Sequence, residues 1–157
     1  MIEARVEIAA SPSKVREIFL DFSKYSKWHT SFVTSIEPVN NAQSSHSRQP
    51  GDELNCDIFD TKFNAVIKSY LNKIQTNHIE QENSETSFQW QGPRMFGIAG
   101  LHGFYIEPAN NGISTSFMQT ETFSGPLGFL MSPYLFGRML IEEFKGFNQD
   151  LKVRAET

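Results

Sequence analysis

Two residues able to exchange protons, His102 and Glu121, flank a sharp turn in the second half of the sequence. The AlaAsnAsnGly segment between them is typical of a hairpin, because Asn and Gly tolerate the positive φ angles of tight turns. The turn can centre on residues 110–111 or on residues 111–112. Strand pairing then places His102 opposite Gln119 or Glu121, and in both cases all three side chains share one face.

An imidazole beside a carboxyl is a pairing that enzymes use for proton transfer. If this face lines a cavity, burial raises the pKa of the Glu121 carboxyl, while a neighbouring imidazole opposes that rise. The same groups could instead form a structural hydrogen-bonded pair, or contact a ligand without reacting. His102 and Glu121 are therefore candidates for catalysis, and the sequence leaves their role open.

Aromatic side chains share the hairpin face described above. Alternation along the strands places Phe104 and Phe117 on this face, with Trp90 on the neighbouring strand. Phe144, on a later helix, is expected to face the sheet. The candidate ligand-binding residues are Trp90, His102, Phe104, Phe117, Gln119, Glu121 and Phe144. A plain hydrophobic core needs apolar residues at the same positions, so these rings are typical of a cavity wall and of a filled interior alike.

The sequence contains no motif for a metal, nucleotide or acyl-enzyme site. It lacks HxH, HExxH and paired-Cys spacings, so a metal site is not expected. It also lacks a Gly-x-Ser-x-Gly elbow and a Gly-rich phosphate loop. We therefore expect no cofactor.

Composition favours a single domain over residues 1–157, with 39% hydrophobic residues and 14 Phe. The net charge of -4 and the interspersed charges argue against nucleic acid as a partner. Cys56 is the single cysteine, and no N-glycosylation sequon, signal peptide or long apolar segment is evident. A cytoplasmic protein without integral membrane association is expected, and its oligomeric state is not predicted.

The first elements follow from changes in periodicity. Residues 2–8 alternate apolar and charged side chains, which predicts a strand with one buried face. Ser11 as N-cap and Pro12 at the first helical position then predict a short helix. A second short helical turn, carrying Tyr25 and Trp28, is expected to follow it.

Later alternation predicts six more strands, at residues 32–39, 53–59, 71–81, 86–91, 98–107 and 113–123. The polar run at residues 40–50 is typical of a loop. Residues 60–70 fit either a helical turn or a hairpin that leads into a long strand, and the sequence leaves both alternatives open.

The last long element is predicted as one amphipathic helix over residues 126–153. Its stripe, with steps of three and four residues, consists of Leu130, Tyr134, Gly137, Ile141, Phe144, Asn148 and Leu151. Ser132 and Pro133 offer a competing first turn, so a kink or a short preceding turn is the alternative. The element order predicts an α+β fold: a curved antiparallel sheet of about seven strands wraps the C-terminal helix, and two short helices lie between strands one and two.

Several segments carry a resemblance to a known family. They are SPSKVREIFLDFSKYSKW after the first strand, PGDEL before the third, FQWQG at residues 88–92, and GLHGFYIEP, NNG and QTETFSG within residues 100–125. In these segments the chain resembles the START-like (SRPBCC) superfamily, in particular its polyketide-cyclase/dehydrase-like branch. The resemblance implies a helix-grip fold over essentially the whole chain. The superfamily includes lipid carriers, receptors and cyclases, so it implies no single function.

Three functions are compatible with this sequence. The first is binding of a small hydrophobic or aromatic ligand, lipid-like or polyketide-like, in a cavity between the sheet and the C-terminal helix. The second is a cyclase or dehydratase in which His102 and Glu121 act as acid and base. The third is an interaction module whose core is filled.

Overall fold

The computed structural model describes residues 1–29, 32–39, 50–58, 74–95 and 97–157. Within these ranges the strands are β1 Ile2–Ile8, β2 Val33–Pro38, β3 Glu53–Ile58, β4 Ile74–Asn83, β5 Ser87–Gln91, β6 Ala99–Ala109 and β7 Ser114–Ser124. The helices are α1 Pro12–Leu20, η1 Phe22–Lys27, η2 Asn110–Gly112, η3 Gly128–Met131 and α3 Gly137–Glu156. The open question about residues 60–70 lies outside the described residues.

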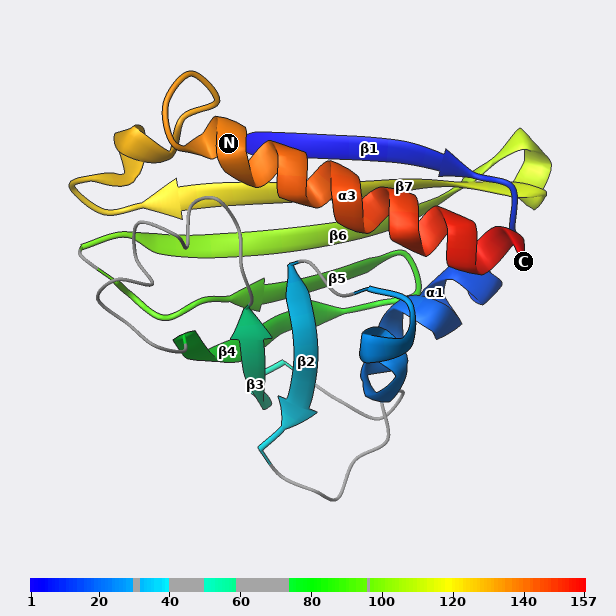
Figure 1. The fold of residues 1–157 in the computed structure, drawn as a ribbon, viewed down its shortest axis with the longest axis horizontal. Coiled ribbons are helices and arrows are strands. Elements are labelled where there is room, and N and C mark those ends of the chain that lie inside the picture. Colours follow the sequence, from blue (N-terminus) through cyan, green and yellow to red (C-terminus); the bar gives the residue numbers. More distant parts are fainter. Residues whose placement is uncertain (30–31, 40–49, 59–73, 96) are drawn as a thin grey trace.

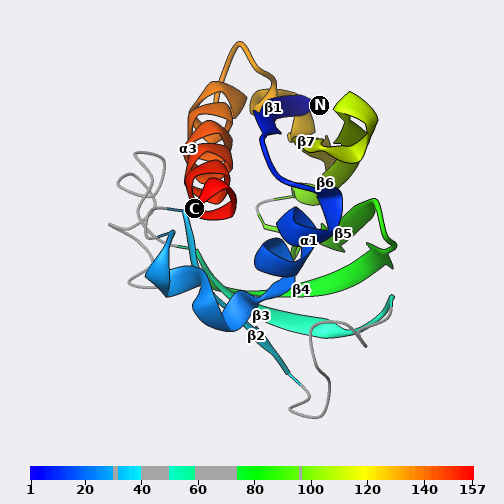
Figure 2. The same cartoon turned by 90° about the vertical axis from the view of Figure 1, so that its right-hand side faces the viewer.

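The described strands form one antiparallel sheet in the order β1-β7-β6-β5-β4-β3-β2 (Figure 1). Figure 2 shows α3 and α1 on the inner side of this sheet. There β1, β7 and β6 stand beside α3, and β4, β3 and β2 pass beneath the helices. The predicted α+β helix-grip fold is confirmed, including α1 and η1 between β1 and β2.

The first elements form for the reasons that the sequence indicates. In β1, Ile2, Ala4 and Ile8 are buried while Glu3 and Glu7 are exposed. The Ser11 hydroxyl then caps α1 by accepting a hydrogen bond from the Lys14 backbone N–H at 3.4 Å.

The core between the sheet and the helices is built mainly from aromatic rings. Phe19 of α1 lies at its centre, with ring centroids 4.7 Å from Phe104 and 5.6 Å from Phe117. Phe147 brings α3 into the same cluster, 6.4 Å from Phe19. Such rings bury large apolar areas, so they supply much of the energy that holds the helices to the sheet.

The single helix predicted from residue 126 is wrong at its start, and the alternative of a short turn before Ser132 and Pro133 is confirmed. Residues 128–131 form the separate turn η3, and α3 begins at Gly137 rather than at residue 126. The break follows from Pro133, which disfavours the helical conformation in the residue before it. Ser132 is accordingly extended, with φ −67° and ψ 156°. Tyr134 therefore lies outside α3 and is 94% exposed, instead of facing the sheet as the stripe predicted.

The β6–β7 hairpin has the register that brings His102 opposite Glu121. Its turn uses positive φ at Asn110 (49°), Asn111 (57°) and Gly112 (83°), so it spans both of the centres considered. β6 ends two residues later than predicted, at Ala109, because pairing continues to the turn itself, and β7 begins one residue later, at Ser114.

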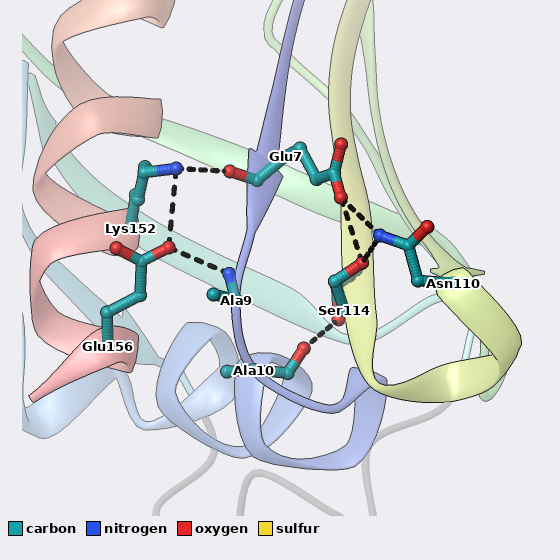
Figure 3. A network of polar contacts seen from close by, with 8 residues as sticks. Glu7, Ala9, Ala10, Asn110, Ser114, Lys152 and Glu156 are labelled. Carbon is teal, nitrogen blue, oxygen red and sulfur yellow. Dashed lines mark hydrogen bonds and ion pairs between the residues drawn. The ribbon is translucent and has the colours of Figure 1, made fainter.

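Polar contacts tie the C-terminal half of α3 to the end of β1 (Figure 3). Lys152 Nζ donates to the Glu7 backbone carbonyl at 2.6 Å, and Glu156 Oε1 accepts from the Ala9 N–H at 2.7 Å. These bonds set the position of α3 over the sheet, and with it the position of residues that α3 turns toward β7. In the described part of the chain, no helix is long and apolar enough to span a membrane.

Candidate functional site

His102 lies in the first half of β6, buried among aromatic rings. Its imidazole stacks on Phe104 with centroids 4.2 Å apart and on Phe144 of α3 at 4.6 Å. Trp90 of β5 meets it edge-on at 5.9 Å. Only 6% of the residue is exposed, so both the sheet and α3 fix the position of this ring.

A chain of hydrogen bonds leads from His102 to α3. His102 Nε2 lies 3.0 Å from Gln119 Oε1. Gln119 Nε2 in turn donates to the Phe144 backbone carbonyl at 3.3 Å and to Asn148 Oδ1 at 2.6 Å. His102, Gln119 and Asn148 are all buried. Buried polar groups need such partners, because an unmade bond in this interior costs about 1–3 kcal/mol.

The surroundings of His102 keep its imidazole neutral. Burial lowers its pKa from 6.5 to about 3, and the nearby His78 acts in the same direction. The hydrogen bond with Gln119 opposes this shift but is the weaker effect. At neutral pH His102 is therefore an uncharged group with one N–H and one free lone pair.

Glu121 pairs with His102 in register, but its carboxyl makes no hydrogen bond or ion pair with the described residues. Part of the residue is exposed, yet the carboxyl lies beneath Gly100, where a Cβ atom would overlap Glu121 Oε1. Burial raises the pKa of this carboxyl from 4.5 to about 8. Glu121 is thus an uncharged acid at neutral pH, available to donate a proton or a hydrogen bond.

A small cavity lies beside His102 and Gln119, between the sheet and the helices. Its volume is about 10 Å³, and its walls include Trp90, His102, Phe104 and Gln119. Phe19 of α1 and Phe147 of α3 close it from the helical side. This volume is about the minimum that holds one water molecule.

Comparison with known proteins shows the family to which the chain belongs. Residues 1–156 match the family described as "Polyketide cyclase / dehydrase and lipid transport". The chain belongs to this family. A comparison with curated proteins finds no match.

Solved structures that share this family's fold are similar over nearly the whole chain. The protein TTHA0849 from Thermus thermophilus is 15% identical, with a TM-score of 0.68 and 98% of this chain and 95% of that chain covered. A START superfamily protein from Mycobacterium smegmatis is 16% identical, with a TM-score of 0.65 and coverages of 99% and 96%. The Zhui aromatase/cyclase from Streptomyces sp. R1128 is 13% identical, with a TM-score of 0.64 and coverages of 99% and 92%. At these identities the likeness shows the fold.

Four of the candidate ligand-binding residues meet at the cavity, and the other three lie around it. Phe144 supports His102 from α3 and Phe117 packs against Phe104 and Phe147. Glu121 lies two residues further along β7 than Gln119, on the same face of the sheet, and is not among the residues that line the cavity.

Sequence reasoning gave no site role to Asn148, the last member of the hydrogen-bond chain. It lies on the buried stripe of α3 and is 2% exposed, and its Nδ2 has no hydrogen-bond partner in the described residues. A polar residue within an otherwise apolar helical stripe was the signal available, since such residues need a buried partner.

His29 is a second buried residue whose role sequence reasoning did not identify. It is 0% exposed, and its Nδ1 lies 2.9 Å from Asp150 Oδ2 of α3. Its Nε2 accepts from the backbone N–H groups of Phe32 at 3.1 Å and Val33 at 3.3 Å. His29 therefore joins the segment after η1 to β2 and α3, which is a structural role.

The ranges that the structure describes contain no group of three or more His, Cys, Asp or Glu residues placed to hold a metal ion. The arrangement that they do contain is an aromatic enclosure around the uncharged His102, with the uncharged carboxyl of Glu121 beyond its wall. Apolar walls with a few placed polar groups are typical of small-molecule sites, although this cavity is only about the size of one water molecule.

Proposed function

We propose that this protein binds a small, largely apolar molecule between the sheet and α3, around His102. The observation that carries this proposal is the cavity itself, in which aromatic walls converge on the His102–Gln119 pair. Apolar walls with a few placed polar groups are the usual character of small-molecule sites. Membership of a family whose description includes lipid transport supports the same reading.

The cavity of about 10 Å³ is much smaller than a ligand, so binding requires the surrounding rings to move apart. A single domain over residues 1–157, a cytoplasmic location and the absence of a nucleic-acid partner stay predictions of the sequence. An interaction module with a filled core is the reading that requires no such movement.

A cavity-filling variant tests the proposal. Val33 lines the cavity, and Val33→Ile adds one methyl group to its wall. Val6→Ile makes the same chemical change on β1, where the side chain packs against the core outside this cavity. Binding of naphthalene and 2-naphthol, followed by NMR chemical-shift changes, should weaken in Val33→Ile and stay unchanged in Val6→Ile.

Native mass spectrometry of protein purified from its own host provides the complementary measurement. A co-purified small molecule, lost after denaturation, is the expected result. No co-purified molecule, together with no shift at Trp90, His102 or Gln119 in either titration, would leave the interaction module as the function.

A second candidate, a cyclase or dehydratase, is supported by the uncharged Glu121 carboxyl, which has no protein partner in the described residues. Such a group can act as a general acid at neutral pH. Incubating the protein with its co-purified molecule separates the two functions. An enzyme converts that molecule and loses conversion in Glu121→Gln, whereas a binding protein returns it unchanged.

A further inference from the structure

The hydrogen-bond chain beneath the cavity has a direction that the backbone fixes. The Phe144 carbonyl can only accept a hydrogen bond, so the Gln119 amide atom 3.3 Å away must be the donating Nε2. The same Nε2 donates to Asn148 Oδ1 at 2.6 Å. The amide oxygen of Gln119 therefore faces His102.

This direction fixes the tautomer of His102. Gln119 Oε1 only accepts, so His102 Nε2, 3.0 Å away, carries the proton and donates it. A neutral imidazole has a single N–H, and burial keeps this imidazole neutral by lowering its pKa to about 3. Nδ1 therefore presents a lone pair, and no described residue donates a hydrogen bond to it.

The rings around His102 leave only its edge open. Phe104 and Phe144 are nearly parallel to the imidazole, with interplanar angles of 20° and 24° and centroids within 4.6 Å. Two rings this close cannot occupy the same space, so they cover opposite faces. A ligand can then reach His102 only in the plane of the imidazole, where the Nε2 side is already taken by Gln119.

We propose that the ligand of this cavity is an uncharged molecule with a hydroxyl or N–H group that donates a hydrogen bond to Nδ1 of His102. This inference rests on the proposed function of the same site. A carbonyl or ether oxygen would set one lone pair against another. A carboxylate would in addition have to lose its hydration among aromatic walls, where no described lining residue supplies a cation to compensate it.

A matched set of probes tests the inference. 2-Naphthol carries a donor, 2-methoxynaphthalene replaces its hydrogen with methyl, 2-naphthoate carries a charge, and naphthalene has no polar group. Isothermal titration calorimetry should show 2-naphthol binding at least about tenfold more tightly than 2-methoxynaphthalene, because one unmade buried hydrogen bond costs about that factor. 2-Naphthoate should bind more weakly than 2-naphthol.

Two variants separate the hydrogen bond from the fit of the ring. His102→Phe retains an aromatic ring between Phe104 and Phe144 but removes Nδ1. Whatever its affinity for naphthalene, it should lose the preference for 2-naphthol over its methyl ether. Tyr105→Phe removes a hydroxyl from β6, at a position whose side chain lies on the opposite face of the sheet, and should keep the preference.

The outcomes distinguish this inference from the proposed function. If none of the four probes binds, the proposed function fails and the inference fails with it. Equal affinities for 2-naphthol and 2-methoxynaphthalene would leave ligand binding intact and overturn the inference. Nitrogen NMR of isotope-labelled protein provides a readout without ligand: His102 should show a protonated Nε2 and a bare Nδ1, and the opposite tautomer would also overturn it.

Discussion

The carboxyl of Glu121 has room inside the fold because residue 100 has no side chain. A Cβ atom at Gly100 would overlap Glu121 Oε1, and it would also lie 3.4 Å from the Phe123 ring. Gly100→Ala should therefore turn the carboxyl toward solvent and lower its pKa from about 8 toward the ordinary value of 4.5. Carbon NMR titration of the labelled carboxyl measures this change.

Gly146→Ala is the control for that substitution, since a Cβ there would have nothing within 4 Å. It should leave the pKa of Glu121 unchanged. A pKa that stays at about 8 in Gly100→Ala would show that the carboxyl does not depend on the space above it.

The imidazole of His29 accepts hydrogen bonds from two backbone N–H groups and also hydrogen-bonds one carboxylate. His29→Phe preserves the ring that packs 4.7 Å from Phe147 but removes the acceptor for the N–H groups of Phe32 and Val33. Leaving these buried donors unpaired should lower the free energy of unfolding by about 2 kcal/mol or more, measured by urea denaturation. Asp150→Asn keeps an acceptor oxygen for His29 Nδ1 and should lower the free energy of unfolding far less. Equal losses in the two variants would contradict the role of His29 Nε2 as acceptor for the two backbone N–H groups.

At the scale of elements, α3 depends on a glycine at its first position. A Cβ at Gly137 would overlap the backbone carbonyl oxygens of Met131 and Ser132, which the preceding turns bring against the helix start. Gly137→Ala should therefore destabilise the fold by more than about 1 kcal/mol, although alanine is the better helix former. Thermal unfolding measures the loss.

Gly146→Ala provides the comparison within the same helix. With open space around residue 146, the intrinsic preference of alanine prevails, and the melting temperature should rise. If both substitutions raised the melting temperature, the close contact at Gly137 would not be what excludes a side chain from the start of α3.

The elements that could be predicted from sequence are those with one buried face. Period-two alternation located β1 and the β6–β7 hairpin, because a sheet covered on one side separates apolar from polar residues at every step. The start of α3 could not be located in this way. The stripe continues through Leu130 and Tyr134, but the local preference of Ser132 before Pro133 breaks the helix there.

In the candidate site, too, the strand pattern predicted which residues lie together but not how they interact. Hairpin register brought His102 opposite Glu121, yet His102 hydrogen-bonds the diagonal neighbour Gln119. That choice depends on Phe144 and Asn148, which α3 presents to Gln119 from a distant part of the chain. Strand parity carries no information about such packing, so the sequence alone predicted the group of residues and not its bonds.

At the scale of the whole molecule, two titratable groups on one face of the sheet, His102 and Glu121, change the stability of the fold with pH in opposite directions. His102 has a pKa of about 3 in the fold and an ordinary value of 6.5. As pH falls from 6.5 toward 3, His102 takes up a proton in the unfolded chain but not in the folded chain. The free energy of unfolding therefore decreases over this range. His29, whose pKa burial also lowers, adds to the loss on the acid side.

Glu121 acts in the opposite direction. As pH rises from 4.5 toward 8, the unfolded chain releases a proton that the folded chain retains, so stability decreases. The two slopes oppose each other between pH 4.5 and 6.5, and the free energy of unfolding should be greatest in that window. Each unit of pKa difference corresponds to about 1.4 kcal/mol, which makes both flanks measurable by urea denaturation.

Two variants test which residue causes the loss of stability on the acid side and which causes the loss on the alkaline side. Glu121→Gln cannot ionise, so its stability should no longer fall between pH 6.5 and 8, and it should exceed the parent protein most at alkaline pH. His102→Phe should instead reduce the loss between pH 4.5 and 3, with the remaining loss arising from His29 and from carboxylates whose pKa values the fold lowers. Parallel profiles for the parent and both variants would mean that neither group changes its proton affinity on folding. An uncharged His102 at the proposed site, and an uncharged Glu121 beyond its wall, would then have no support.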